Sequence, residues 1–125
     1  MSDHGVIHIE IPSSDPQTNA KFYAAAFDWK IENSAGFDYW LFKPQSGPGG
    51  GFPGFDAEMG IQRGEILLYI GTDDIEASLA KIESLGGKIL SPKHEIPGMG
   101  WWAFFADPTG NKLGLYKRLR PTAGD

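Results

Sequence analysis

The stretch from Gly100 to Lys117 constrains the fold more than any other part of the chain, because two apolar runs flank a strong turn signal. The turn is Asp107-Pro-Thr-Gly110, in which proline pre-sets φ at the second position and glycine can adopt a positive φ at a bulge. Aromatic and aliphatic residues on both sides of this turn predict two antiparallel strands joined as a hairpin.

The turn also predicts the register of this hairpin. A type I turn followed by a glycine bulge places Asp107 opposite Asn111. On one face the resulting pairs are ordinary core residues: Ala103 with Leu115, and Phe105 with Leu113. On the other face they combine large aromatic residues with a glycine: Trp102 with Tyr116, and Phe104 with Gly114. Because a glycine leaves room beside the rings, we expect ligand binding on this second face.

Composition excludes several classes of protein. A chain of 125 residues forms one domain of common size, and a net charge of −5 argues against a nucleic-acid partner. The absence of cysteine excludes disulfides, thiolate metal sites and cysteine nucleophiles. No apolar run is long enough to cross a membrane and no signal peptide precedes Val6, so we expect a cytoplasmic protein without a membrane partner.

The chain begins with a strand followed by a helix. Residues from Val6 to Pro12 alternate with a period of two, which puts His8 and Glu10 on one face and the isoleucines on the other. Ser14 or Asp15 can cap a helix that has Pro16 in its first turn and continues to Phe27.

The remaining elements are predicted from the same signals. Strands are expected at Trp29–Glu32, Phe37–Lys43, near Gly50–Phe55, at Glu65–Thr72 and at Lys88–Ser91, with a turn at Asn33–Gly36. A second helix, Ile75–Leu85, is capped by Asp73-Asp74 and ended by Gly86-Gly87. Pro92–Met99 is expected to be a turn-rich crossing into the final hairpin.

The order of elements repeats: strand, helix and three strands occur twice, with a period of about 58 residues. We therefore expect an α+β fold of two modules, at about 5–58 and 64–118, with a tail at 119–125. Neither module can close a sheet alone, so their sheets should curl together around a groove with both helices outside. The residues expected to face the groove are His8, Glu10, Leu67, Tyr69, Gly71, Trp102, Phe104, Gly114 and Tyr116.

Several motifs together resemble the vicinal oxygen chelate superfamily, which contains glyoxalases, bleomycin-resistance proteins and extradiol dioxygenases. They are His8-Ile-Glu-Ile-Pro, Lys21-Phe-Tyr, Phe27-Asp-Trp, Asp73-Asp-Ile, Gly86-Gly-Lys and Phe105-Ala-Asp-Pro-Thr-Gly-Asn-Lys-Leu-Gly-Leu. The resemblance covers nearly the whole chain. It implies tandem βαβββ modules that form a curved mixed sheet around a cleft.

Metal enzymes of this superfamily bind a divalent ion through four strand residues, mostly His and Glu. Carried over to this chain, the first of these positions falls on His8, which matches. The other three fall on the Gly49–Gly51 region, Leu67 and Gly114, none of which offers a ligand side chain. One ligand of four does not make a metal site, so we expect neither a metal nor another cofactor.

Two functions and a dimer follow from these observations. The first function is metal-free binding of a small planar or hydrophobic molecule by Tyr69, Trp102, Phe104, Gly114 and Tyr116, as in the drug-sequestering members. The second is a lyase or isomerase in which His8 and Glu10 transfer a proton, with or without a weakly held metal. His8 could instead be a structural hydrogen-bonding residue, and the aromatic residues could be core. We also expect a homodimer, because family members often form one and because Trp40, Phe55 and Trp101 of a lone chain would present exposed aromatic surface.

Overall fold

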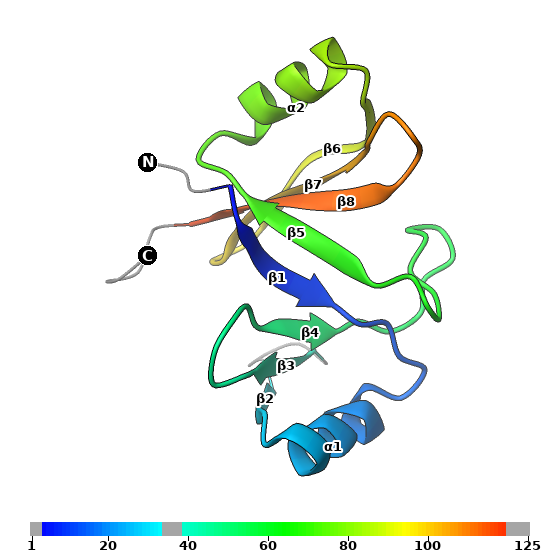
Figure 1. Ribbon diagram of the computed structural model, residues 1–125, viewed down its shortest axis with the longest axis vertical. Coiled ribbons are helices and arrows are strands. Elements are labelled where there is room, and N and C mark those ends of the chain that lie inside the picture. The colour runs from blue at the N-terminus through cyan, green and yellow to red at the C-terminus, as the bar shows by residue number, and fades with distance from the viewer. Residues whose placement is uncertain (1–3, 34–38, 120–125) are drawn as a thin grey trace. The chain divides into compact units, whose positions relative to one another are not determined.

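The computed structural model describes residues 4–33 and 39–119, whose helices and strands are labelled in Figure 1. In chain order they are β1 (Val6–Glu10), α1 (Pro16–Phe27), β2 (Lys30–Asn33), β3 (Trp40–Lys43), β4 (Gly50–Phe52), β5 (Leu67–Gly71), α2 (Ile75–Ser84), β6 (Lys88–Ile96), β7 (Gly100–Ala106) and β8 (Lys112–Arg118). The chain divides into two compact units. The first unit is His8–Leu68, and the second unit is Met1–Ile7 together with Tyr69–Asp125.

In the first unit the strands follow the order β2-β3-β4-β1. The β2–β3 and β3–β4 pairs are antiparallel, whereas β4 and β1 are parallel. Helix α1 begins where the Asp15 side chain accepts a hydrogen bond from the Thr18 N–H, with proline in the first turn, and ends at Asp28. Its apolar side packs on a buried cluster formed by Ala20, Phe42 and Phe52.

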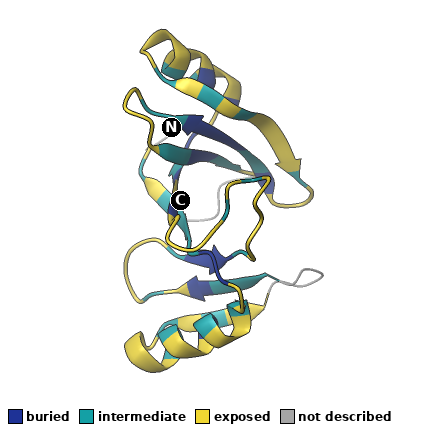
Figure 2. Cartoon of the chain, turned by 90° about the vertical axis from the view of Figure 1, so that its right-hand side faces the viewer, coloured by how far each residue is buried: buried dark blue, intermediate teal, exposed yellow. Residues whose placement is uncertain are grey.

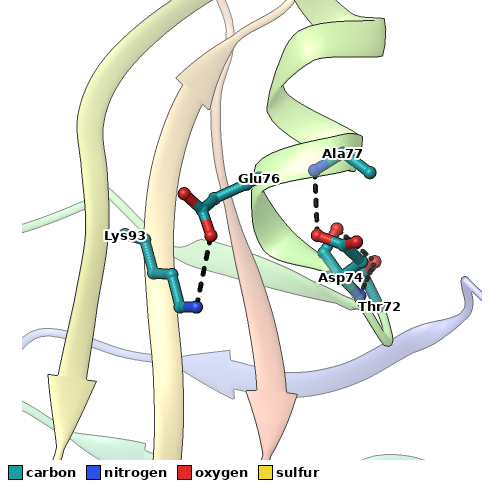
Figure 3. A network of polar contacts seen from close by, with 5 residues as sticks. All are labelled: Thr72, Asp74, Glu76, Ala77 and Lys93. Atoms are coloured by element: carbon teal, nitrogen blue, oxygen red, sulfur yellow. Dashed lines mark hydrogen bonds and ion pairs between the residues drawn. The ribbon is translucent and has the colours of Figure 1, made fainter.

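In the second unit the strands follow the order β5-β8-β7-β6, with β5 and β8 parallel and the other pairs antiparallel. Helix α2 covers one face through Ile75 and Leu79, which pack on β7 and β8. The Asp74 carboxylate accepts the Ala77 N–H at the start of α2 (Figure 3). Figure 2 shows that the buried residues lie mainly on the strands, while the outer surfaces of both helices are exposed.

The predicted α+β class and the repeated order of strand, helix and three strands are therefore confirmed. The hairpin register is confirmed pair by pair, including Ala103 with Leu115 and Phe104 with Gly114. Gly110 adopts the expected positive φ of 99°. None of the described helices has the length and apolarity needed to span a membrane.

Asp107 holds the hairpin turn together through its side chain. Its carboxylate accepts hydrogen bonds from the backbone N–H groups of Thr109 and Asn111 and from the Asn111 side-chain amide. These bonds favour the charged carboxylate, so the pKa of Asp107 falls to about 2, with the Asn111 side chain as the largest cause. The aspartate that marks the turn in the sequence is thus also the residue that fixes it.

The prediction of a turn-rich crossing at Pro92–Met99 was wrong for residues 92–96 and is confirmed for the turn at residues 97–99. Strand β6 continues through Pro92 to Ile96, and its pairing with β7 shifts register between Ile89 and Ser91 and again between Ser91 and His94. Proline is tolerated because β6 is the edge strand of the second unit's order, where a missing N–H need not break a ladder bond, and bulges absorb the extra residues. Most of the predicted turn Asn33–Gly36 and the start of the predicted strand Phe37–Lys43 fall on residues 34–38. These lie outside the described residues.

Candidate functional site

Three polar side chains of the first unit form a continuous hydrogen-bonded chain. His8 and Glu10 project from the same face of β1, as their alternation predicts. The Tyr39 hydroxyl lies 3.0 Å from His8 Nε2 and 2.8 Å from Glu10 Oε2. All three side chains are half-buried, so they hold their geometry while remaining accessible to a small molecule.

The direction of these bonds fixes where the protons lie. The Tyr39 hydroxyl has one hydrogen, which it donates to the Glu10 carboxylate. The contact with His8 therefore requires the imidazole to donate its Nε2–H to the tyrosine oxygen. The chain runs from imidazole N–H through the phenol to the carboxylate. We call His8, Tyr39 and Glu10 the polar triad.

Gly51 makes the polar triad possible. It pairs with Glu10 in the parallel β1–β4 ladder and with Leu41 in the antiparallel β3–β4 ladder. A Cβ at Gly51 would overlap the Tyr39 ring and its hydroxyl oxygen. The glycine thus leaves the space in which the Tyr39 phenol lies.

Aromatic rings form a row across the face of the second unit opposite α2. Tyr69 and Phe104 have centroids 6.1 Å apart, and Trp102 lies 4.6 Å from Phe104. His94 of β6 extends the row by stacking on Trp102 at 4.5 Å and an interplanar angle of 20°. We call Tyr69, Phe104, Trp102 and His94 the aromatic row.

Exposure differs along the aromatic row. Tyr69 and Phe104 are buried, at 7% and 4% relative exposure. Trp102 is half-buried and His94 is exposed. A molecule that binds to the row without moving its side chains therefore contacts the end formed by Trp102 and His94 rather than the end formed by Tyr69.

The space beside Gly114 is not open as the sequence suggested. Gly114 pairs with Tyr69 in the β5–β8 ladder and with Phe104 in the hairpin. A Cβ at Gly114 would overlap the Tyr69 ring. The glycine makes room for a side chain of the protein itself, which corrects the expectation that it leaves a hole for a ligand.

Tyr116 lies on the same face, next to Trp102 in the hairpin register. Its hydroxyl donates a hydrogen bond to the Met99 carbonyl oxygen at 3.2 Å. Partial burial raises the pKa of this phenol, against the opposing effect of the nearby Arg118 cation. Tyr116 is therefore neutral at physiological pH and offers a half-buried polar edge.

The sequence matches the family model of the glyoxalase-like domain over residues 8–116, which includes both the polar triad and most of the aromatic row's face. The chain belongs to this glyoxalase-like family. It is 33% identical over 122 residues to a glyoxylase-like domain-containing protein of Didymella fabae, covering 92% of this chain and 95% of that protein. It is 24% identical to the longer Mycobacterium bovis protein CFP32, of which it spans 45%.

Solved structures agree on the fold of the glyoxalase-like domain. Methylmalonyl-CoA epimerase from Mycobacterium tuberculosis superposes with a TM-score of 0.74 at 16% identity, covering 97% of this chain and 92% of that chain. Methylmalonyl-CoA epimerase from Streptomyces coelicolor gives a TM-score of 0.67 at 16% identity, covering 92% of this chain and 97% of that chain. The family model over residues 8–116, rather than these distant structures, confirms the resemblance to the vicinal oxygen chelate superfamily, to which glyoxalases belong.

Of the four positions carried over from the superfamily's metal enzymes, His8 is the one that carries a ligand side chain. The Gly49–Gly51 region and Gly114 lack ligand side chains, and tyrosine rings lie in the space beside Gly51 and Gly114. Leu67 is a buried aliphatic residue. Within residues 4–33 and 39–119, no group of three or more His, Cys, Asp or Glu side chains is placed to hold a metal ion.

The structure brings the predicted site residues together in two sets. His8 and Glu10 meet in the first unit through Tyr39, and Tyr69, Trp102, Phe104, Gly114 and Tyr116 share one face of the second unit. Sequence reasoning missed Tyr39 and His94. Tyr39 precedes the alternating Trp40 and Phe42, which face α1, so the same period-two argument applied to β3 could have put it on the side of His8.

Proposed function

We propose that this glyoxalase-like domain binds a small planar or hydrophobic molecule without a resident metal, as the drug-sequestering members of its superfamily do. The observation that carries the proposal is the Tyr39 hydroxyl between His8 and Glu10, lying in the space that Gly51 leaves. A phenol, an imidazole and a carboxylate at hydrogen-bonding distance give a site that orients a ligand by hydrogen bonds rather than by chelation.

The aromatic row supports the same proposal from the second unit. Trp102 and Tyr116 present half-buried aromatic surface, which stacks well with planar molecules and carries polar edges. In a soluble protein such residues gather at binding sites because they combine a large contact area with few rotatable bonds.

Metal content and trapped ligand provide the first test. We expect the purified chain to hold no stoichiometric Zn, Ni, Mn or Fe, because three of the four superfamily positions lack ligand atoms. Elemental analysis after native purification measures this. Native mass spectrometry of the same sample should show a small organic molecule above the 13.6 kDa chain mass. One tightly bound metal ion per chain would overturn the proposal.

A second candidate function is proton transfer by the polar triad. The continuous path from His8 Nε2–H through the Tyr39 hydroxyl to Glu10 is the observation that favours it, because a positioned acid–base pair exchanges protons efficiently with a substrate. The enzyme would then be a lyase or isomerase, with Tyr39 holding the imidazole and the carboxylate in place.

Replacing Tyr39 by phenylalanine tests this candidate, since the ring can stay beside Gly51 while the hydroxyl is lost. A proton-transfer enzyme should incorporate solvent deuterium into a carbon acid such as methylmalonyl-CoA, and Tyr39→Phe should slow this by roughly 100-fold or more. Tyr23→Phe in α1 is the matched control and should leave the rate unchanged. If the unaltered chain incorporates no solvent deuterium into any of a panel of carbon acids, proton transfer is excluded for these substrates and ligand binding remains the proposed function.

The expected homodimer stays a prediction. Of the aromatic residues that suggested an interface, Trp40 and Trp101 are half-buried and pack on the cores of their own units, and Phe55 remains 42% exposed.

A further inference from the structure

The strand register defines which residues share the face of the aromatic row. Residues paired across an antiparallel ladder project to the same side of the sheet. The partners that β6 and β8 contribute to this side are Lys88, Ser91, His94, Ile96, Lys112, Gly114, Tyr116 and Arg118. Between them lie Gly100, Trp102, Phe104 and Ala106 of β7.

The charged residues among these strand partners all have one sign. Lys88, Lys112 and Arg118 are cationic, and none of these described strand partners is Asp or Glu. The chain as a whole carries a net charge of −5, so three cationic residues without an acidic one among these described strand partners depart from its average. The face is therefore suited to a negatively charged partner.

The α2 side of the same strands carries both signs. Glu95 pairs with Trp101 there, and Lys93 makes an ion pair of 3.4 Å with Glu76 of α2 (Figure 3). Lys93 and Lys117 both lie over the Trp101 ring, at 5.4 and 5.3 Å. The basic character is thus a property of one face and not of these strands in general.

One of these cations, Lys112, lies directly beside the aromatic row. The ammonium of Lys112 lies 4.4 Å from the centroid of Phe104, next to Trp102. Lys88 and Lys112 are the cross-strand partners of Ala106 from its two sides, so both begin on the side of Phe104 that is remote from Trp102. Lys88 is exposed and Lys112 half-buried, which leaves both accessible to solvent.

We infer that the ligand of this face is a planar molecule that carries an anionic group, either a carboxylate or a phosphate. The planar body stacks on Trp102 at the exposed part of the row, and its anionic group extends along β7 past Phe104 towards Lys112 and Lys88. Charge-assisted hydrogen bonds from ammonium groups are stronger than neutral ones, so the charge of the ligand decides its affinity. This inference rests on the proposed function and adds the chemical class of the ligand.

A charge-matched pair of probes tests the inference: 2-naphthoate and neutral 2-naphthamide, titrated into the full chain by calorimetry. We expect naphthoate to bind at least about tenfold more tightly than the amide, as charge-assisted hydrogen bonding implies. Lys112→Gln should remove roughly tenfold of the naphthoate affinity and leave the amide unchanged. Lys88→Gln, at an exposed position, should also lower the affinity for naphthoate. Raising the salt concentration should weaken the binding of naphthoate alone.

Lys117→Gln is the matched control, because Lys117 lies in the same strand but over Trp101 on the α2 side. It should leave both affinities unchanged. Equal binding of the two probes, or an equal effect of Lys117→Gln and Lys112→Gln, would overturn the inference while the proposed function stands. Binding of neither probe would overturn both.

Discussion

Replacing Gly50 by alanine is expected to destabilise the protein by about 3 kcal/mol or more, the upper end of the usual cost of overpacking. A Cβ at this position would overlap the carbonyl oxygen of Ile9 and would lie 2.7 Å from Phe42 Cζ. Gly50 is the parallel-ladder partner of Ile9, and Phe42 is a core residue of the first unit. Neither neighbour can move without breaking the pairing of β1 with β4 or opening the core.

Gly54→Ala is the matched control, since it lies four positions further along and an added Cβ would meet nothing within 4 Å. It should change the free energy of unfolding by less than about 0.5 kcal/mol. Urea denaturation of both variants, followed by circular dichroism, measures the difference. Similar stabilities for Gly50→Ala and Gly54→Ala would show that β1 and β4 do not approach as closely as described.

The same experiment bears on the polar triad. β1 carries His8 and Glu10, and β4 carries the glycine that leaves space for Tyr39. A triple glycine such as Gly49–Gly51 is compatible with a flexible linker or with a strand that another backbone approaches closely. The structure shows the second, since Gly50 and Gly51 lie in a buried strand. The polar triad is held by a close backbone contact and not by a loop.

Local chemistry made much of the fold predictable. The hairpin register followed from Asp107, Pro108 and Gly110, because turn type and loop length determine which residues pair. Both helix starts followed from aspartate caps, Asp15 and Asp74. These signals act over a few residues, so they can be recognised without knowing the rest of the structure.

Contacts between distant residues were not predictable in this way. The Tyr39 hydroxyl reaches Glu10 across 29 positions of sequence, and its placement depends on the missing side chain of Gly51. The continuation of β6 past Pro92 depends on its edge position, which only the strand order reveals. In both cases the residue type is compatible with two local structures: a linker or a close contact for Gly51, and a turn or an edge strand for Pro92. Contacts with residues distant in the sequence determine which one forms.

Gly114 is the clearest example in the second unit. From sequence it predicted a hole for a ligand opposite Phe104, and Gly114→Leu would then fold normally and lose only binding. The structure predicts the opposite outcome. The Tyr69 ring occupies the space beside Gly114, and both Tyr69 and Phe104 are buried. A leucine side chain at this position would therefore overlap its neighbours. We expect Gly114→Leu to lose about 2–3 kcal/mol of stability from overpacking.

A double-mutant cycle with Tyr69→Ala separates this explanation from a general intolerance of β8. Truncating Tyr69 removes the ring that a Cβ at Gly114 would meet, so Gly114→Leu should cost markedly less in the Tyr69→Ala background. We expect a coupling energy of roughly 1–2 kcal/mol, within the range seen for residues in contact. Thermal and urea unfolding of the four proteins in the cycle measure it. Additive costs would show that the ring of Tyr69 does not fill the space beside Gly114. If the melting temperature of the Gly114→Leu single variant were unchanged, the space beside Gly114 would be open, as the sequence suggested.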